Sequence, residues 1–209
     1  MSDKPIWALS ATELVKKTKN NDLSATEITF AYLEHIKTIN PELNAIVDDM
    51  SKEAIKRAEN LDSAAKSGDS KGRLFGVPVT VKINVDQKGY ATSNGVSALK
   101  NSIASQNAPI VDHLLNAGAI FVGRTNTPEF SFRAETENPL YGRTHNPWGK
   151  HLSPGGSSGG ASSAVMSGMC ALAHGNDIGG SLRFPSVATG AVTLKPGLGR
   201  VPAWNSSQT

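Results

Sequence analysis

The first seventy residues carry a hydrophobic pattern with the period of an α-helix. Residues 10–13 and 24–27 both read Ser-Ala-Thr-Glu, a capping box that marks the start of a helix. After the second box, apolar side chains at spacings of three and four predict one buried helix face: Ile28, Tyr32, Ile36 and Ile39. Because proline disfavours helical geometry in the residue before it, we expect this helix to end at Asn40 and Pro41. A third helix is expected over about residues 51–65, with its apolar face formed by Ile55, Ala58, Leu61 and Ala65.

From residue 76 the period changes to two, which is typical of a strand. Valines at 77, 79 and 81 alternate with Pro78, Thr80 and Lys82. A helix over 109–116 and a strand over 119–122 follow in the order of a β-α-β unit. Residues 125–154 read as a long ordered loop. A small-residue helix is then expected over about residues 161–172, and a glycine-rich turn leads into another helix. The alternation of strands and helices predicts an α/β fold.

The composition suits a folded domain and narrows the classes of function. The 209 residues are 38% hydrophobic and 19% charged, with a net charge of +3. A single cysteine, Cys170, excludes an internal disulfide and any multi-cysteine metal site, and we expect it to be an inert buried side chain. The histidines lack metal-ligand spacing and the basic residues form no stripe, so neither a metal, a cofactor nor a nucleic acid is expected. With no secretory signal and no membrane-spanning segment, we expect a cytoplasmic protein that does not bind a membrane.

Lys82 is the first candidate for chemistry, because it lies inside the apolar run of residues 77–85. Lysine is seldom fully buried unless it is paired. In one interpretation its side chain leaves the strand edge and reaches water. In the other it is desolvated, and a fall of its pKa from about 10.4 to about 7 would make it a general base. The segment alone leaves both open.

The second candidate is the glycine and serine turn of residues 153–160, Ser-Pro-Gly-Gly-Ser-Ser-Gly-Gly. A flexible linker would continue into polar sequence, whereas this turn runs into buried-type residues, which favours an ordered turn before a helix. It contains a Gly-x-Ser-x-Gly pattern at 156–160, but no histidine follows Asp177, so the Ser-Asp-His order of an α/β-hydrolase cannot be completed. It also lacks the Gly-Lys-Ser/Thr of a phosphate-binding P-loop.

The third candidate is the turn of residues 176–185, Asn-Asp-Ile-Gly-Gly-Ser-Leu-Arg-Phe-Pro. Consecutive glycines let peptide N–H groups converge, as an oxyanion hole requires. Ser181 could equally be an ordinary helix N-cap. For Asp177 and Arg183, an ion pair that braces the turn is favoured over contact with substrate.

Together these three motifs resemble the amidase signature family. Further matches are Gly-Val-Pro-Val-Thr-Val-Lys-Ile-Asn-Val-Asp at 76–86, the segment 123–133 and the segment 194–202. Each motif is weak alone, but the ordered set is specific. The resemblance implies a mixed β-sheet flanked by helices, with residues 1–68 as an amino-terminal helical segment and residues 69–209 as the amino-terminal part of the catalytic domain.

The resemblance also implies a Ser–cisSer–Lys triad and hydrolysis of carboxamides through an acyl-enzyme. By motif position, Ser181 corresponds to the nucleophile, Ser157, after a cis peptide bond, to the bridging serine, and Lys82 to the base. The N–H groups that correspond to the oxyanion hole belong to Ile178, Gly179, Gly180 and Ser181. The expected partner is a small amide substrate.

The chain departs from the family pattern at two loop positions and in its length. Asn176 stands where Thr or Ser is usual, and Gly197 where Thr is usual. Family members are roughly twice as long, beyond one domain of ordinary size. We therefore expect a truncated chain that forms a homodimer or associates with a carboxy-terminal half. Two other functions remain possible: the glutamine-hydrolysing subunit of a tRNA amidotransferase, which Phe184 in place of Gln disfavours, and a catalytically inert binding protein.

Overall fold

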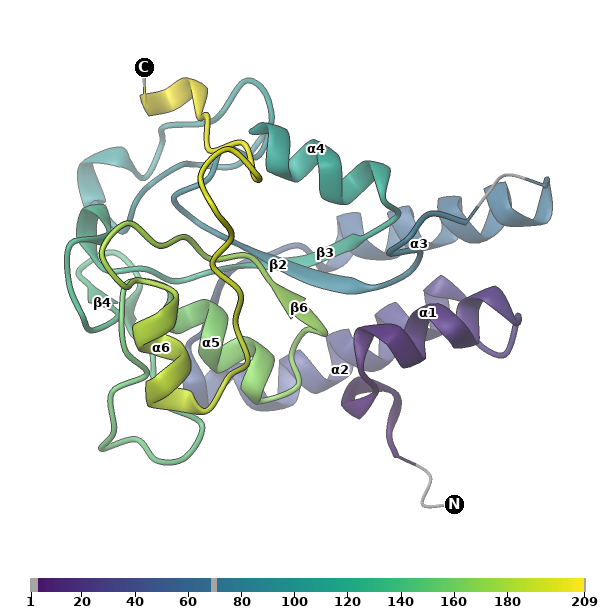
Figure 1. Ribbon diagram of the computed structural model, residues 1–209, viewed down its shortest axis with the longest axis horizontal. Helices are drawn as coiled ribbons and strands as arrows, with labels where there is room; N and C mark the ends of the chain where they lie inside the picture. Colours follow the sequence, from purple (N-terminus) through teal and green to yellow (C-terminus); the bar gives the residue numbers. More distant parts are fainter. Residues whose placement is uncertain (1–3, 69–70, 209) are drawn as a thin grey trace.

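The computed structural model describes residues 4–68 and 71–208 (Figure 1). Its helices are α1 (Ala11–Lys19), α2 (Ala25–Leu43), α3 (Ser51–Lys66), α4 (Pro109–Asn116), α5 (Gly159–Met166) and α6 (Arg183–Thr189). Its strands are β1 (Ile46–Asp49), β2 (Pro78–Lys82), β3 (Ile120–Thr125), β4 (Glu137–Asn138), β5 (Gly142–Arg143) and β6 (Leu172–Ala173). Short 3-10 turns lie at 6–8, 97–99, 129–131 and 206–208. None of the helices described is both long and apolar enough to cross a membrane.

Four strands form the central sheet, in the order β1-β3-β2-β6. β2 is parallel to β3 and to β6, whereas β1 is antiparallel to β3. α4 joins β2 to β3, which confirms the expected β-α-β unit. The sheet is mixed and the fold is α/β, as expected. Every residue of β2 and β3 is buried, as in parallel strands covered on both faces.

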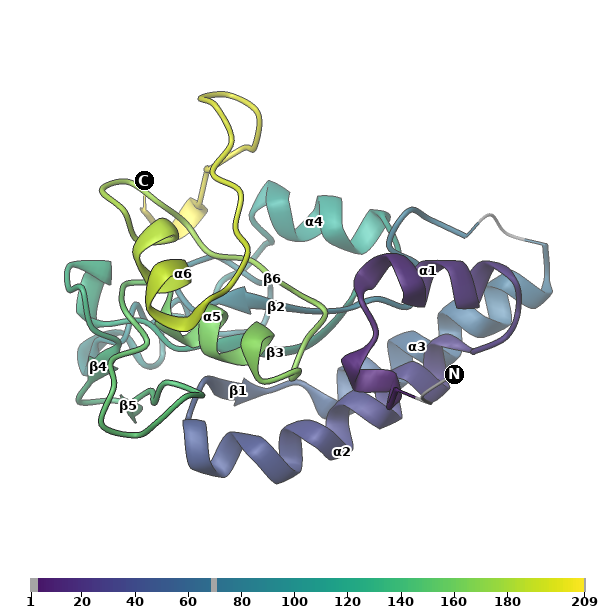
Figure 2. The ribbon, with the colours of Figure 1, turned by 60° about the horizontal axis from the view of Figure 1, so that its bottom comes forward.

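The two faces of β2 belong to two different cores. Its valines pack with Val111 of α4 in one apolar cluster. On the opposite face, α2, α3 and α5 share a second cluster with Ile120 of β3. Thr80 and Lys82 lie on this second face, because alternate residues of a strand point to opposite sides. Figure 2 shows α4 on one side of the sheet and α5 and α2 on the other.

The amino-terminal helices largely follow the sequence prediction. Both capping boxes form: Ser10 and Ser24 accept from the backbone N–H groups of Glu13 and Glu27, whose carboxylates bond back. The expected end of α2 is wrong, because the helix passes through Pro41 and stops at Leu43. Pro41 lacks only its own N–H bond, and the chain leaves the helix at Asn44, whose φ is +48°.

Two other boundaries differ from the prediction in the second half of the chain. The small-residue helix α5 ends at Met166 and does not reach residue 172, since Gly168 has a φ of +76°. A side chain at Gly168 would also collide with the Trp7 ring, 2.8 Å from an ideal Cβ. The freed residues Leu172 and Ala173 form β6, a strand that the periodicity did not predict.

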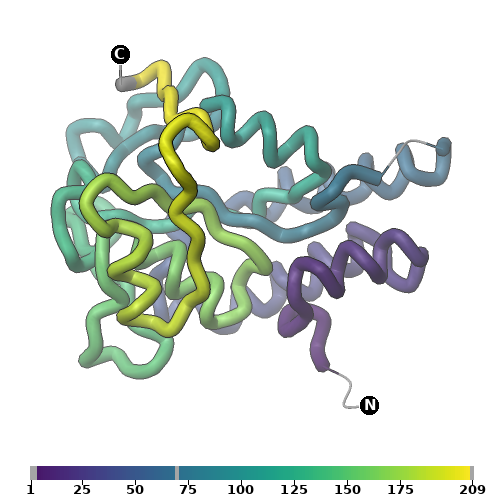
Figure 3. Tube along the Cα trace, in the orientation of Figure 1, coloured from purple at the N-terminus to yellow at the C-terminus, as the bar shows by residue number. Residues whose placement is uncertain are grey.

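The carboxy-terminal segment returns across the molecule to the loop that follows β2 (Figure 3). The Asp86 carboxylate accepts from the hydroxyl of Ser206 at 2.9 Å and from the N–H of Ser207 at 2.8 Å. The Asn205 side chain accepts from the Asp86 N–H at 3.1 Å and donates to the Asn84 carbonyl at 3.0 Å. The loop immediately after Lys82 is therefore fixed by a segment more than a hundred residues further along the chain.

A buried arginine ties the same loop to the sheet. Arg124 of β3 is fully buried and donates to the Asp48 carboxylate at 2.9 Å and to the backbone carbonyls of Ala91 and Val85 at 2.8 and 2.9 Å. Burial lowers the pKa of Arg124, and Asp48 opposes that shift. Removing one partner of a buried ion pair leaves an uncompensated charge, which is costly.

We expect Asp48→Asn to lower the free energy of unfolding by about 3 kcal/mol, because the Arg124 charge would lose its carboxylate partner. The neighbouring Asp49 is exposed and accepts from the Ser51 N–H at 2.9 Å, so Asp49→Asn should cost less than about 1 kcal/mol. Urea unfolding of both variants measures the difference. Equal losses would contradict a special role for the Arg124 pair.

A row of apolar side chains in the carboxy-terminal segment is exposed. Val192 and Leu198 have exposed fractions of 101% and 106%, and Leu194 of 81%. Contiguous exposed apolar surface of this kind favours association. We expect the 209-residue chain to self-associate in size-exclusion chromatography with light scattering, and Val192→Ser, Leu194→Ser and Leu198→Ser together to shift it towards monomer. The polar control is Lys195→Ser with Arg200→Ser. A wild-type chain that stays monomeric would contradict this expectation.

Candidate active site

Lys82 is the last residue of β2 and has an exposed fraction of 0%. The interpretation in which its side chain reaches water is therefore wrong. Its Nζ lies 2.7 Å from Ser157 Oγ, 3.2 Å from Ser158 Oγ and 2.8 Å from Asn176 Oδ1. The parallel strands β2, β3 and β6 end at the same edge of the sheet, which brings Lys82 beside the residues that follow β6.

The turn before α5 places Ser157 against this lysine. The Gly156–Ser157 peptide bond is cis, as the family resemblance implied, and Ser157 is fully buried. The glycines are needed for close packing: a Cβ at Gly156 would lie 2.4 Å from the Arg133 carbonyl oxygen, and one at Gly160 2.5 Å from the Asn126 nitrogen. The flexible-linker interpretation is wrong, because this turn is packed against residues 126–136.

Two residues that the sequence did not single out complete the surroundings of the lysine. Ser158 is fully buried, and its hydroxyl exchanges hydrogen bonds with the backbone of Asn176, at 3.3 Å to both the carbonyl and the N–H. The Asn176 side chain faces Lys82 from the segment after β6. Ser158 directly follows a candidate serine, but nothing in the sequence indicated that Asn176 would contact Lys82.

Ser181 lies on the neighbouring turn, and its backbone carbonyl accepts from the Ser158 N–H at 3.0 Å. The two serine turns are therefore joined directly through the backbone. The N-cap interpretation of Ser181 is wrong, since α6 begins at Arg183 with Leu182 at the N-cap. Among the described residues the Ser181 hydroxyl makes no hydrogen bond and is partly exposed. The structure thus joins Lys82 to Ser157, and holds Ser181 next to this pair without a side-chain bond to either.

Asp177 braces the turn that carries Ser181, as expected. Its carboxylate accepts from the Arg183 guanidinium at 2.9 and 3.0 Å and from the N–H groups of Gly180, Leu182 and Arg183. The Arg183 hydrogen bonds come first among the causes that hold the pKa of Asp177 far below its ordinary value. The Gly180 N–H is therefore already bonded here. Within the described chain, the N–H groups of Ile178, Gly179 and Ser181 make no hydrogen bond.

Burial controls the charges at this site. Desolvation lowers the pKa of Lys82 to about 7, with Asp177 opposing the shift. It also lowers the pKa of His174, two residues before Asn176, to about 4, and the nearby Lys82 adds to that shift. Burial raises the pKa of Cys170 to about 12, which confirms the expected inert thiol. Near neutral pH, Lys82 is thus poised between amine and ammonium, while His174 is uncharged.

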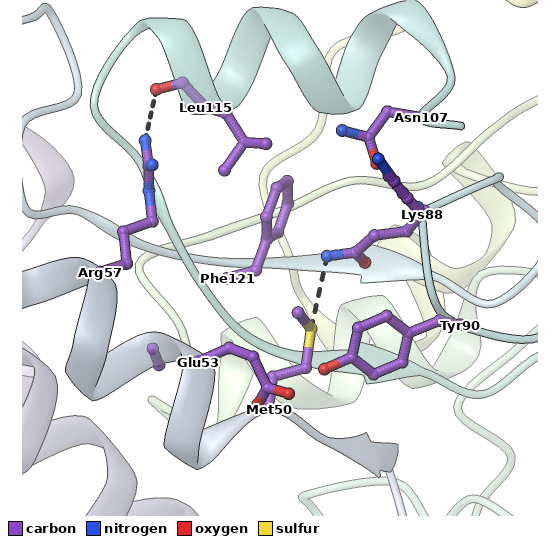
Figure 4. Close-up of a pocket in the computed structure, with 10 residues that line it drawn as sticks. Met50, Glu53, Arg57, Lys88, Tyr90, Asn107, Leu115 and Phe121 are labelled. Atoms are coloured by element: carbon purple, nitrogen blue, oxygen red, sulfur yellow. Dashed lines mark hydrogen bonds between the residues drawn. The ribbon is translucent and has the colours of Figure 1, made fainter. Parts of the chain in front are cut away.

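A separate hollow of about 310 Å³ lies between α3 and α4 over β3 (Figure 4). Its lining includes Met50, Arg57, Tyr90 and Phe121. Arg57 spans it and donates to the Leu115 carbonyl at 2.5 Å. The hollow shares no residue with the Lys82 cluster. No three His, Cys, Asp or Glu side chains gather as a metal site anywhere in residues 4–68 and 71–208.

The comparison with known families decides the identity of this arrangement. The model of the amidase family matches residues 27–207. The chain belongs to the amidase family. This match covers the lysine, both serine turns and the whole central sheet.

Individual relatives agree with this assignment. The chain is 50% identical over 205 residues to an indoleacetamide hydrolase of Bradyrhizobium diazoefficiens, covering 98% of this chain and 39% of the relative. It is 38% identical to an acylating-complex relative, a glutamyl-tRNA(Gln) amidotransferase subunit of Caldanaerobacter subterraneus, covering 94% and 40%. The crystal structure of a bacterial aryl acylamidase of the amidase signature family superimposes with a TM-score of 0.86 at 32% identity, covering 89% and 39%. The chain thus spans about two fifths of the length of these amidase relatives.

The buried lysine predicts a specific dependence of stability on pH. The folded amidase chain releases the Lys82 proton at about pH 7, whereas an unfolded lysine holds it until about pH 10.4. Between these values the unfolded chain binds more protons, so the free energy of unfolding should rise with pH. Over the whole window the rise is about 4 kcal/mol, at roughly 1.4 kcal/mol per unit.

Lys82→Met should remove this rise and stabilise the chain at pH 7, since no buried amine would need desolvation. Lys88→Met, at an exposed lysine, should leave the slope as it is. Urea unfolding between pH 6.5 and pH 9.5 measures the slopes, in a range chosen to stay below tyrosine ionisation. A wild-type slope equal to that of Lys82→Met would show that Lys82 titrates normally.

Proposed function

We propose that this amidase-family chain carries the catalytic groups for hydrolysis of the C–N bond of small carboxamides. One observation supports this most strongly: the fully buried Lys82 lies 2.7 Å from Ser157 Oγ, on a turn whose backbone is bonded to that of Ser181. A neutral amine in contact with a serine hydroxyl is a general base for nucleophilic attack. The proposed roles are Ser181 as nucleophile, Ser157 as bridging serine and Lys82 as base.

In the first half of the proposed reaction, Lys82 takes the Ser157 proton while Ser157 takes that of Ser181. Ser181 Oγ then bonds to the amide carbonyl carbon. When the C–N bond breaks, the leaving nitrogen takes a proton from Ser157, which recovers one from the Lys82 ammonium. In the second half, water replaces the amine, attacks the acyl-enzyme by the same proton path and releases the carboxylic acid.

The oxyanion of the tetrahedral intermediate needs peptide N–H groups beside Ser181. Those of Ile178, Gly179 and Ser181 are unbonded within the described chain and are the proposed donors. Gly180 would contribute only if its bond to Asp177, 2.8 Å long here, were exchanged. Loss of one such donor typically costs about 3 kcal/mol of transition-state stabilisation.

The substrate class follows the relatives rather than a pocket of this chain. Because the chain is 50% identical to an indoleacetamide hydrolase, we propose primary amides of aryl-acetic acids as the first substrates to test. Glutamine hydrolysis for a tRNA amidotransferase is the second candidate, supported by 38% identity to a subunit of such an enzyme. Phe184, half exposed beside the Ser181 turn, favours apolar substrates over glutamine.

We expect Ser181→Ala to abolish formation of an acyl-enzyme, because no other hydroxyl occupies the nucleophile position. The measurement is ammonia release from indole-3-acetamide and glutamine and aniline release from an acyl anilide, together with intact-mass detection of the acyl adduct. It is made on the 209-residue chain, where we expect turnover at the level of Ser181→Ala, and on a chimera that adds the remaining three fifths of the Bradyrhizobium relative, where we expect full turnover.

Lys82→Met in the chimera should lower turnover by several orders of magnitude, since both proton transfers lose their base. Lys88→Met, the same change at an exposed lysine, is the control and should leave turnover unchanged. An undiminished adduct in the Ser181→Ala chimera would exclude the proposed mechanism. A chimera that folds but hydrolyses none of the amides would favour an inert binding protein.

A further inference from the structure

The hydrogen-bond network around Lys82 fixes where each proton must lie. A serine hydroxyl has one proton to donate and two lone pairs that accept. Ser158 Oγ donates its proton to the Asn176 carbonyl and accepts from the Asn176 N–H. Only one lone pair remains for Lys82 Nζ, 3.2 Å away. Ser158 can therefore only accept from the lysine.

The side chain of Asn176 imposes the same condition from another direction. Its Oδ1 lies 2.8 Å from Lys82 Nζ, and an amide oxygen is an acceptor with no proton to give. Two of the three groups around the amine, Ser158 and Asn176, thus require N–H donors from Lys82. The third group, Ser157, can donate to it or accept from it.

A neutral lysine amine has two N–H donors and one lone pair. If Ser158 Oγ and Asn176 Oδ1 take the two N–H groups, the lone pair is left facing Ser157 Oγ at 2.7 Å. This is the orientation in which the amine can remove the Ser157 proton. Without the Asn176 acceptor, the amine could rotate and direct an N–H towards Ser157 instead.

We propose that Asn176 is a positioning residue, which holds the lone pair of neutral Lys82 on Ser157 and does so without adding charge. The inference rests on the proposed function, because it assigns Lys82 the role of base. Asn176 stands where the family resemblance leads one to expect Thr or Ser, so this acceptor is a feature of this chain. A hydroxyl can accept as well as donate, whereas the amide oxygen accepts only.

The charges facing Lys82 make the neutrality of Asn176 important. Asp177 favours the ammonium, but its carboxylate is bonded to Arg183 and to three backbone N–H groups. His174 is uncharged near neutral pH. An unpaired carboxylate in contact with Nζ would instead hold the proton on Lys82, since an opposite charge at this distance raises a lysine pKa by about 1–3 units.

The first test titrates Lys82 directly in the 209-residue chain and needs no turnover. Lysine labelled with carbon-13 at Cε reports protonation by NMR, and Lys82→Met identifies the resonance. We expect Asn176→Asp to raise the midpoint by about 1–3 pH units and Asn176→Leu to lower it, because the lost acceptor had favoured the ammonium. Asn176→Thr, which keeps an acceptor, should lie nearest to the wild type.

The matched control is Asn101→Asp, which adds the same charge at an exposed position and should leave the Lys82 midpoint unchanged. If Asn176→Asp does not fold, the order of Leu below Thr and wild type still decides. Identical midpoints in the wild type and in every folded Asn176 variant would overturn the proposal.

The second test separates orientation from protonation. Acylation of Ser181 by a fluorophosphonate is followed at a pH above all measured midpoints, where Lys82 is neutral in every variant. We expect Asn176→Leu to acylate at least tenfold more slowly than the wild type and Asn176→Thr to recover most of the rate. Equal rates for Leu and wild type would overturn the orienting role. Absence of acylation in the wild type would count against the proposed function alone, and the titration order would still test the contact.

Discussion

Burial of the Lys82 amine is the constraint on which the site depends. An ammonium ion taken out of water must either be paired with charge or lose its proton. Among the described residues no carboxylate contacts Nζ, and its three partners are two hydroxyls and an amide oxygen. The surroundings therefore accept hydrogen bonds without supplying negative charge, and the pKa of the lysine falls to about 7. The same polar shell prevents the amine from being left unsatisfied and determines its orientation.

The sheet explains why this shell can be built from distant segments. Lys82 ends β2, and the segment with His174 and Asn176 leaves β6, its parallel neighbour. Parallel strands deliver their carboxyl ends to one edge, where loops from different parts of the chain meet. α5 covers the same face of the sheet, so the turn at its start lies over that edge. Arg124 and Asp86 then fix the loop that leaves Lys82.

The sequence predicts those features that depend on local chemistry. Capping boxes located α1 and α2, period-two alternation located β2, and motif order indicated which lysine and serines would meet. It failed where tertiary contacts decide: Pro41 was read as a helix end, and residues after Met166 as helix rather than β6. Asn176 is the clearest case. As a single residue in a glycine-rich turn it has no signal of its own, and only the register of β6 against β2 brings it to the lysine.

The two serine turns differ in how completely this chain encloses them. The Ser157 turn is closely packed, and added methyl groups at its glycines would strike backbone atoms. The Ser181 turn is open: an ideal Cβ at Gly179 or Gly180 meets nothing within 4 Å, and the Ile178 side chain is fully exposed. The protonation state of the lysine is thus set by contacts among the described residues, whereas the surface that would hold an acyl group lies on the exposed side of Ser181. Proton transfer and substrate selection therefore depend on different parts of the site, and substitutions around Lys82 should alter pH dependence without altering which amide is preferred.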